Sequence, residues 1–294
     1  MKKRFSIITW FIDSYEQIFQ LAVLIVVIVL PFKFEFQAIV ELKQPEMNLQ
    51  QLAIYYALRH GNICIAVVLA LMVVLMFHKL NKDKVLNHGN RYHCRSMFEY
   101  WIYSRILGYC KCSLVRVPIS DQFKLILSDL YDDYIVGKYD EASDNENIVV
   151  RKFGSPVRRS LLVQAPLCNE ENMNFATEKI YIVVSDTYPI TEDMLPAKCN
   201  EHNTVIIQRT INKEDCRRYK SSALTAKVLN IVRHIDKEVT VNILPTTNVI
   251  NTFDIVNEVF KTGGRDNIRH LYVFPQPHKT ENDWKFSEKG TRIF

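Results

Sequence analysis

A loop rich in arginine is the strongest candidate for chemistry in this chain. Arg209, Arg217 and Arg218 lie close together in the sequence, and Tyr219 follows them directly. Guanidinium groups match the geometry of phosphate oxygens, so this loop could bind a phosphodiester. An arginine pair seen alone would be interpreted as solvated surface, because such charges are mostly exposed. With Arg209 upstream and the tyrosine adjacent, we favour an anion-binding site.

Two threonines offer a second set of candidate ligand groups. Thr246 and Thr247 follow the apolar run 239–244. Their hydroxyl groups could hydrogen-bond a base edge or a phosphate. The same residues could instead cap the helix that the sequence predicts at 252–260, since threonine is a good N-cap residue. Both roles could hold at once.

The sequence contains no familiar catalytic or metal-binding motif. It has no GxxxxGK[ST] phosphate loop, no HExxH and no GxSxG. Asp132, Asp133 and Asp186 have no histidine nearby in sequence and are interpreted as surface or loop acids. The seven cysteines lack metal-ligand spacing, and their odd number argues against a fully paired disulfide scaffold. We therefore expect no catalytic residue, no metal, no cofactor and no enzyme activity.

The second half of the chain alternates apolar runs with helical patterns. Strands are expected at 180–184, 204–208, 239–244 and 270–274, and helices at 221–234 and 252–260. Strands that alternate with helices predict an α/β domain, and ligands of such domains gather at strand ends. The net charge of +5, from 37 basic and 32 acidic residues, is too small to imply a nucleic-acid partner.

A further helix is expected at 123–139. Apolar residues recur there near the helical spacing, among them Leu127, Leu130, Tyr131 and Tyr134. Tyr134 could line a ligand cleft or a dimer seam, or it could simply pack against the rest of the domain.

Two apolar runs in the first third of the chain predict a membrane hairpin. Clear spans are expected at about 10–32 and 52–78, because a spanning helix needs roughly 20 apolar residues. Basic residues lie outside both ends of the hairpin, which places both chain ends in the cytosol. Bulky aromatic residues follow the first run, so it does not resemble a cleaved signal peptide. The alternative is a pair of buried helices in a soluble protein.

The stretch 97–117 mixes aromatic and charged residues. It fits either an amphipathic helix at the lipid headgroups or a further span. We divide the chain into a membrane region, 1–117, and a cytosolic α/β ligand-binding domain, 118–294.

The order of these features resembles the STING (stimulator of interferon genes) family of membrane-anchored cyclic-dinucleotide receptors. The sensor strand of that family is similar to Ile180–Pro189, and its Arg-x-Tyr lid is similar to Arg217–Tyr219. Its Pro-Thr-Thr helix start is similar to Leu244–Thr247. Its first sensor helix is similar to Tyr134–Tyr139, although Lys138 stands where the family has a second tyrosine.

The resemblance implies an α-helical membrane region followed by a STING-like α/β domain. The protein would be a homodimer that binds a cyclic dinucleotide, such as a cyclic GMP-AMP or cyclic di-GMP, between its subunits. It would form higher oligomers on signalling. Either Lys138 or Tyr139 would meet the base. The family resemblance implies these ligand-binding residues: Tyr134, Lys138, Tyr139, Arg209, Arg217, Arg218, Tyr219, Thr246 and Thr247.

The same resemblance implies an innate-immune receptor of antiviral defence. Its membrane would be the endoplasmic reticulum in an animal and the inner membrane in a bacterium. No direct nucleic-acid partner is expected, and the downstream signalling protein stays open. Two alternatives remain: a pore-forming membrane effector gated by another nucleotide or by a protein, and a membrane enzyme that acts on a nucleotide.

Overall fold

The chain folds into two compact units. The computed structural model describes residues 7–33, 61–89, 91–142, 147–153, 177–209, 218–263, 267–276 and 284–294. The first unit comprises residues 1–86, 98–112 and 130–133, and the second comprises 87–97, 113–129 and 134–294. The domain boundary expected after residue 117 stays a prediction.

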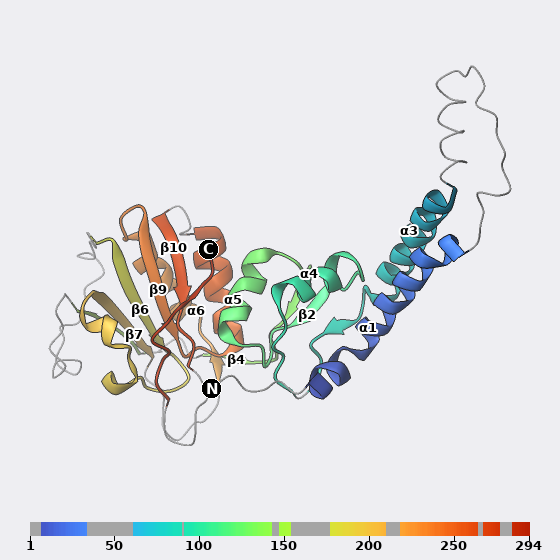
Figure 1. Ribbon diagram of the computed structural model, residues 1–294. Helices are drawn as coiled ribbons and strands as arrows, with labels where there is room; N and C mark the ends of the chain where they lie inside the picture. Colours follow the sequence, from blue (N-terminus) through green and yellow to red (C-terminus); the bar gives the residue numbers. More distant parts are fainter. Residues whose placement is uncertain are drawn as a thin grey trace, which may run out of the picture. The chain divides into compact units, whose positions relative to one another are not determined.

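Two long apolar helices dominate the first unit. Helix α1 (Ile7–Val29) continues into the 3₁₀ helix η1 (Leu30–Lys33), and α3 (Gly61–Asn81) lies beside it (Figure 1). Both helices are long and apolar enough to cross a membrane, and only 11% of the most apolar window of each is buried. A core helix of a soluble protein would be mostly buried, so the soluble alternative does not fit. The two apolar helices expected at 10–32 and 52–78 are present as candidate spans, except that residues 52–60 lie outside the described part.

A short helix and two short strands complete the first unit. Helix α4 spans Met97–Arg105, and β1 (Val85–Leu86) pairs in parallel with β2 (Lys111–Ser113). The nine residues of α4 rise about 14 Å at 1.5 Å per residue, which is far short of the roughly 30 Å hydrocarbon core. The alternative of a third span in 97–117 is therefore wrong, and a helix at the membrane surface remains.

A six-stranded sheet forms the centre of the second unit. Its strand order is β11-β10-β9-β6-β7-β5. The four inner strands are parallel to one another, and the two edge strands are antiparallel to their neighbours. The strands are β5 (Ile148–Phe153), β6 (Lys179–Ser185), β7 (Asn203–Arg209), β9 (Val239–Pro245), β10 (Ile268–Val273) and β11 (Thr291–Arg292). The four predicted strands are thus confirmed.

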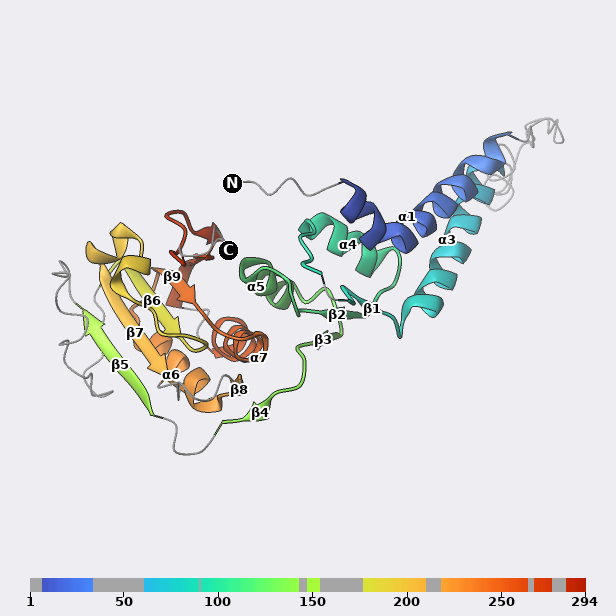
Figure 2. The same ribbon diagram turned by 90° about the horizontal axis from the view of Figure 1, so that it is seen from below.

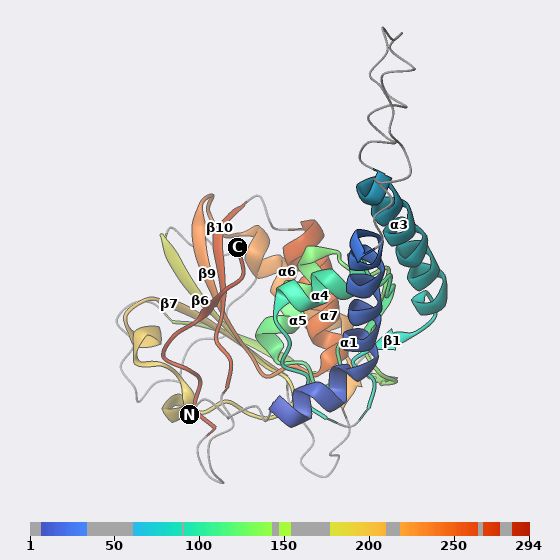
Figure 3. The same ribbon diagram turned by 45° about the vertical axis from the view of Figure 1, so that its right-hand side comes forward.

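Both faces of this sheet are covered. All five residues from Ile180 to Val184 are at most 1% exposed, as the continuous apolar run of β6 predicts. On one face lie α6 (Ser222–Arg233) and α7 (Val249–Asp254), which continues into the π-helix η7 (Ile255–Gly263) (Figures 2 and 3). On the other face, the 3₁₀ helices η5 (Glu192–Met194) and η6 (Ala197–Asn200) and the C-terminal segment enclose a second apolar cluster.

The helix expected at 123–139 is shorter and begins earlier. Helix α5 spans Ile119–Ser128 and ends at Asp129, whose φ of 52° is left-handed. The chain then runs through the short strands β3 (Asp133–Ile135) and β4 (Asp140–Glu141). The expectation that Tyr134, Lys138 and Tyr139 lie on a helix is therefore wrong.

The parallel strands contain one topological switch point. The chain passes from β6 to β7 on one side of the sheet, and then adds β9 and β10 on the other side of β6. The connection that leaves β6 therefore runs towards β7, and the connection that leaves β9 runs the opposite way, towards β10. In open α/β sheets, ligands bind outside the carboxyl ends of the strands at such a point.

Candidate functional site

Polar groups close the switch point where β6 and β9 end. The backbone N–H of Asp186 donates to Thr246 Oγ1 at 3.3 Å, and that hydroxyl donates to the Val184 carbonyl oxygen at 3.2 Å. Thr247, the next residue, shares a 2.7 Å hydrogen bond with the Thr252 hydroxyl. Both predicted threonine hydroxyl groups are thus engaged within the fold.

Arg209 ends β7 and lies in a buried ion pair. Its Nε is 2.9 Å from Asp186 Oδ1, and the two side chains are 7% and 0% exposed. The other carboxylate oxygen accepts hydrogen bonds from the Asn248 backbone N–H (3.2 Å) and from Asn251 Nδ2 (2.8 Å). Asp186 does lie in the loop after β6, but the interpretation of it as a surface acid is wrong, because it is buried and its carboxylate is paired.

Asn248 and Asn251 connect this cluster to the arginine loop. Asn248 caps α7 by accepting a hydrogen bond from the Asn251 backbone N–H at 2.9 Å. The cap of this helix is thus Asn248 and not one of the two threonines before it. The side-chain amides of both asparagines donate to the Tyr219 carbonyl oxygen, at 2.8 and 3.0 Å. Tyr219 is held next to the switch point through its backbone.

Two short strands bring a predicted tyrosine beside a predicted arginine. Strand β4 pairs in parallel with β8 (Tyr219–Lys220), and Asp140 lies opposite Tyr219. Tyr139 and Arg218 directly precede the two strands, and the charge of the exposed Arg218 acts on the Tyr139 phenol. Burial raises the pKa of Tyr139, while the Arg218 charge and a hydrogen bond with the Val249 backbone oppose the rise. The phenol therefore stays protonated near neutral pH.

Tyr188 joins this group, although the sequence analysis did not select it. It lies in the loop after β6, where burial raises its pKa and the charge of Arg218 again opposes the rise. Its hydroxyl donates to Gln276, and its ring centroid is 5.9 Å from that of Trp284. Its position in the loop that follows a buried central strand was the signal that could have identified it.

Three predicted ligand-binding residues remain: Tyr134, Lys138 and Arg217. Tyr134 donates its hydroxyl hydrogen to the Leu125 carbonyl oxygen, and its ring centroid is 6.1 Å from that of Phe253. These contacts are those of the packing role, and a role of Tyr134 in a ligand cleft stays a prediction. Lys138 is exposed beside Tyr139. Arg217 lies outside the described residues.

The carboxyl edge of the sheet therefore combines the exposed guanidinium of Arg218 with two phenol rings on a rigid polar support. Among the residues that the structure describes, no carboxylate forms an ion pair with Arg218. A guanidinium group can bind a phosphate through two parallel hydrogen bonds. Tyrosine rings can stack on bases, and their hydroxyl groups can hydrogen-bond them. This chemistry suits a nucleotide.

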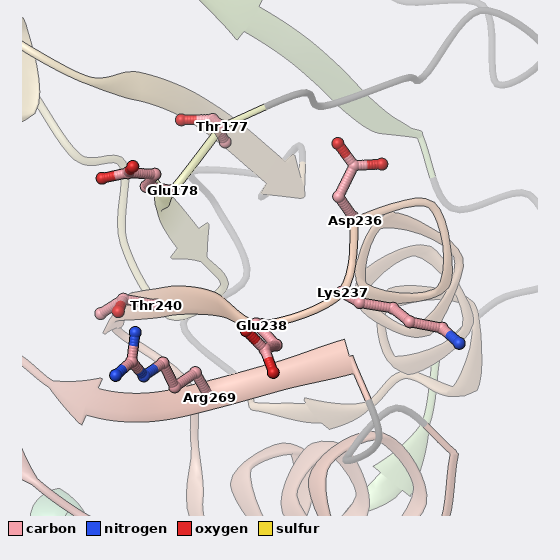
Figure 4. Close-up of a pocket in the computed structure, with 7 residues that line it drawn as sticks. All are labelled: Thr177, Glu178, Asp236, Lys237, Glu238, Thr240 and Arg269. Carbon is pink, nitrogen blue, oxygen red and sulfur yellow. The ribbon is translucent and has the colours of Figure 1, made fainter.

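A pocket of about 600 Å³ lies at the opposite edge of the sheet, beside the amino ends of the parallel strands (Figure 4). It is lined by Thr177, Glu178, Asp236, Lys237, Glu238, Thr240 and Arg269. Three acidic and two basic side chains give this wall no preference for an anion, so we favour the carboxyl edge. Within the described residues, no group of three or more histidine, cysteine, aspartate or glutamate side chains could hold a metal ion. The absence of a metal site stays a prediction.

A protein-family comparison matches nearly the whole chain. The matching model is described as the SMODS- and Ubiquitin system-associated 2TM effector domain, and it covers residues 2–293. That description fits the two apolar helices followed by a mixed α/β region, and it does not name the STING family. A search of curated proteins found no match.

Proposed function

The chain belongs to the family of SMODS- and Ubiquitin system-associated 2TM effector domains, and from that premise we propose that nucleotide binding to its α/β unit activates its membrane helices. The family places the protein among transmembrane effectors of nucleotide-signalling defence systems. The observation that carries the proposal is the cluster of Arg218, Tyr139 and Tyr188 at the carboxyl edge of the sheet. The same chain carries the two candidate spans.

In this proposal, each part of the site has a distinct task. Arg218 neutralises a phosphate, and Arg217 assists it from the same loop. Tyr139 and Tyr188 contact the bases, and Lys138 lies close enough in sequence to meet a second phosphate. The buried pair of Arg209 and Asp186, with the switch-point threonines, keeps the strand ends in place.

The finer part of the proposal concerns the ligand and the assembly. We propose that the nucleotide is a cyclic dinucleotide bound between two copies of the chain. A two-fold symmetric ligand suits an isologous dimer, because both subunits present the same groups to it. The resemblance of the Arg217–Tyr219 and Leu244–Thr247 stretches to STING supports this choice.

The output that we propose is membrane permeabilisation by the helix hairpin, without turnover of the nucleotide. Binding would favour one conformation of the α/β unit, which shifts the population of the whole protein. A receptor that instead recruits a soluble partner is the second candidate, and the STING resemblance supports it.

The test uses the full-length protein in vesicles loaded with a self-quenching dye. We would add cyclic di-AMP, cyclic di-GMP and the cyclic GMP-AMP isomers separately, and measure binding by calorimetry in parallel. Dye release with one of these nucleotides, lost in Arg218→Ala, is the expected result. Arg233→Ala, which removes an exposed arginine on α6, is the matched control and should release dye normally.

Three other outcomes would each contradict a specific part of the proposal. Binding without release would exclude permeabilisation and favour the receptor. Release that is equal with and without every nucleotide would exclude nucleotide gating. Consumption of the nucleotide would identify an enzyme.

A further inference from the structure

An exposed aromatic pair lies on one face of α4. Phe98 is 68% exposed and Trp101 is 45% exposed, and their stacked rings are 6.2 Å apart at an interplanar angle of 10°. Residues three apart lie on the same face of a helix. The opposite face is buried through Tyr100, Tyr103 and Ser104. Because exposed aromatic surface is unfavourable in water, an apolar medium is expected to cover this pair.

Hydrogen bonds hold α4 against the ends of the two candidate spans. Trp10, which begins the first span, donates from Nε1 to Glu99 Oε1 on α4 at 2.7 Å. Asn81, which ends the second span, donates from Nδ2 to the carbonyl oxygen of Leu107 at 2.7 Å, just beyond α4. The helix is therefore fixed beside the first residue of one candidate span and the last residue of the other.

Several basic side chains of the first unit lie in the last turn of α3, after it, or on and after α4, among acidic ones such as Glu16 and Asp83. The basic ones are Lys79, Lys82, Lys84, Arg105 and Lys111. Two of them form ion pairs, Lys84 with Glu16 at 3.2 Å and Lys111 with Asp83 at 3.4 Å. Exposed ion pairs of this kind are weak, so the cations stay available to anionic headgroups.

We propose that α4 is an interfacial membrane anchor whose Phe98 and Trp101 insert between the headgroups and acyl chains of an anionic lipid surface. Tryptophan favours this layer because its ring is apolar while its N–H is polar. The contact adds a third point of membrane attachment to the two spans. Its continuity with the spans selects lipid over a protein partner as the covering medium.

The chain contains its own control for this inference. Of its three tryptophans, Trp284 lies in the second unit and is 48% exposed, nearly the same as Trp101. The full-length protein would be reconstituted in phosphatidylcholine–phosphatidylglycerol vesicles with lipids brominated near the headgroup end of the acyl chain. Trp101→Phe should lower the lipid-quenched share of the emission from about two-thirds to about one-half, because Trp10 would then be the one tryptophan left at that depth beside the unquenched Trp284. Trp284→Phe should raise this share.

Three results would overturn the inference. An unchanged quenched share in Trp101→Phe would show that Trp101 does not touch lipid. Stronger quenching of Trp101 by bromines near the terminal methyl would show deep insertion instead of an interfacial position. Protection of Trp101 from both brominated lipid and aqueous iodide would show that a second copy of the chain covers it. Both variants keep the Trp10–Glu99 hydrogen bond, so misfolding is not expected to confuse the result.

Discussion

Two arginines of the α/β unit carry the same charge and have opposite surroundings. Arg209 is buried against Asp186, whereas Arg218 is exposed at the sheet edge. Arg209→Ala would leave the Asp186 carboxylate buried without its cation. We expect the free energy of unfolding to fall by about 3–5 kcal/mol, measured by urea denaturation. A loss below about 1 kcal/mol would mean that solvent reaches this carboxylate.

Arg218→Ala should show the reverse pattern. Its exposed side chain contributes little to folding, so the free energy of unfolding should change by less than about 0.5 kcal/mol. Loss of a charged phosphate contact should weaken nucleotide binding by about tenfold or more, measured by calorimetry. Arg218→Lys keeps the charge but loses the two-pronged geometry, so it should restore only part of the affinity. Full affinity in Arg218→Ala would exclude this residue from the site.

Cys199 makes folding sensitive to alkaline pH. Burial raises the pKa of its thiol from 9.0 to about 12. The unfolded chain therefore loses this proton at a lower pH than the folded chain does. The free energy of unfolding should fall as pH rises from 9 towards 12, by at most about 1.4 kcal/mol per pH unit from this group. Cys199→Ala should remove that contribution in urea titrations at several alkaline pH values, and an unchanged slope would contradict the assignment.

At the scale of elements, a polar contact joins the two candidate spans. The side-chain amides of Gln20 and Asn81 exchange two hydrogen bonds, at 3.1 and 2.9 Å, and Asn81 also binds the Leu107 carbonyl oxygen. Asn81→Leu keeps the size of the side chain and removes all three bonds. We expect a loss of about 1–2 kcal/mol, measured as a lower unfolding midpoint in detergent. Leu80→Ala, at an exposed neighbour, should have a smaller effect.

The strands could be predicted well from the sequence because each is a short apolar run with polar residues or proline at its ends. The run from Ile180 to Val184 is continuous and apolar, which is typical of a parallel strand covered on both faces. The helix expected at 123–139 failed for a local reason. Asp129 takes a left-handed conformation, which aspartate tolerates better than most residues, and Lys261 from the π-helix pairs with it at 2.8 Å. Apolar spacing alone carries no information about that turn.

The candidate site could be predicted only in part, because local sequence patterns carry no information about which distant segments meet. Arginine and tyrosine in one loop pointed to an anion, and the pairing of β4 with β8 leaves Tyr139, just before β4, within reach of the Arg218 charge. That pairing joins segments far apart in the chain, so no local pattern contained it. Residue type alone also could not show that Arg209 is buried in an ion pair while Arg218 is exposed. The partner of Arg209 is Asp186, a buried acid that follows a different strand. The sequence shows which residues are charged, but the order of the strands in the sheet determines which of these charges form ion pairs.

At the scale of the whole molecule, the candidate spans limit what an activated effector can do to a membrane. Every residue from Leu21 to Leu30 is apolar, and every residue from Ile63 to Phe77 is apolar if Cys64 is counted with them. A pore built from these stretches would have an apolar wall. Such a wall admits water only when it is wide, and it offers no charge or carbonyl group to distinguish ions.

If nucleotide binding opens such a pore, as proposed above, the leak should therefore not discriminate between cations and anions. In planar bilayers with a potassium chloride gradient, the reversal potential should stay close to zero, because both ions cross with similar ease. Leu75→Glu places a carboxylate on an exposed part of α3, and it should move the reversal potential towards the value for cations if this helix lines the path. A strongly selective leak in the unmodified protein would instead show that polar groups outside these two stretches form the conducting wall.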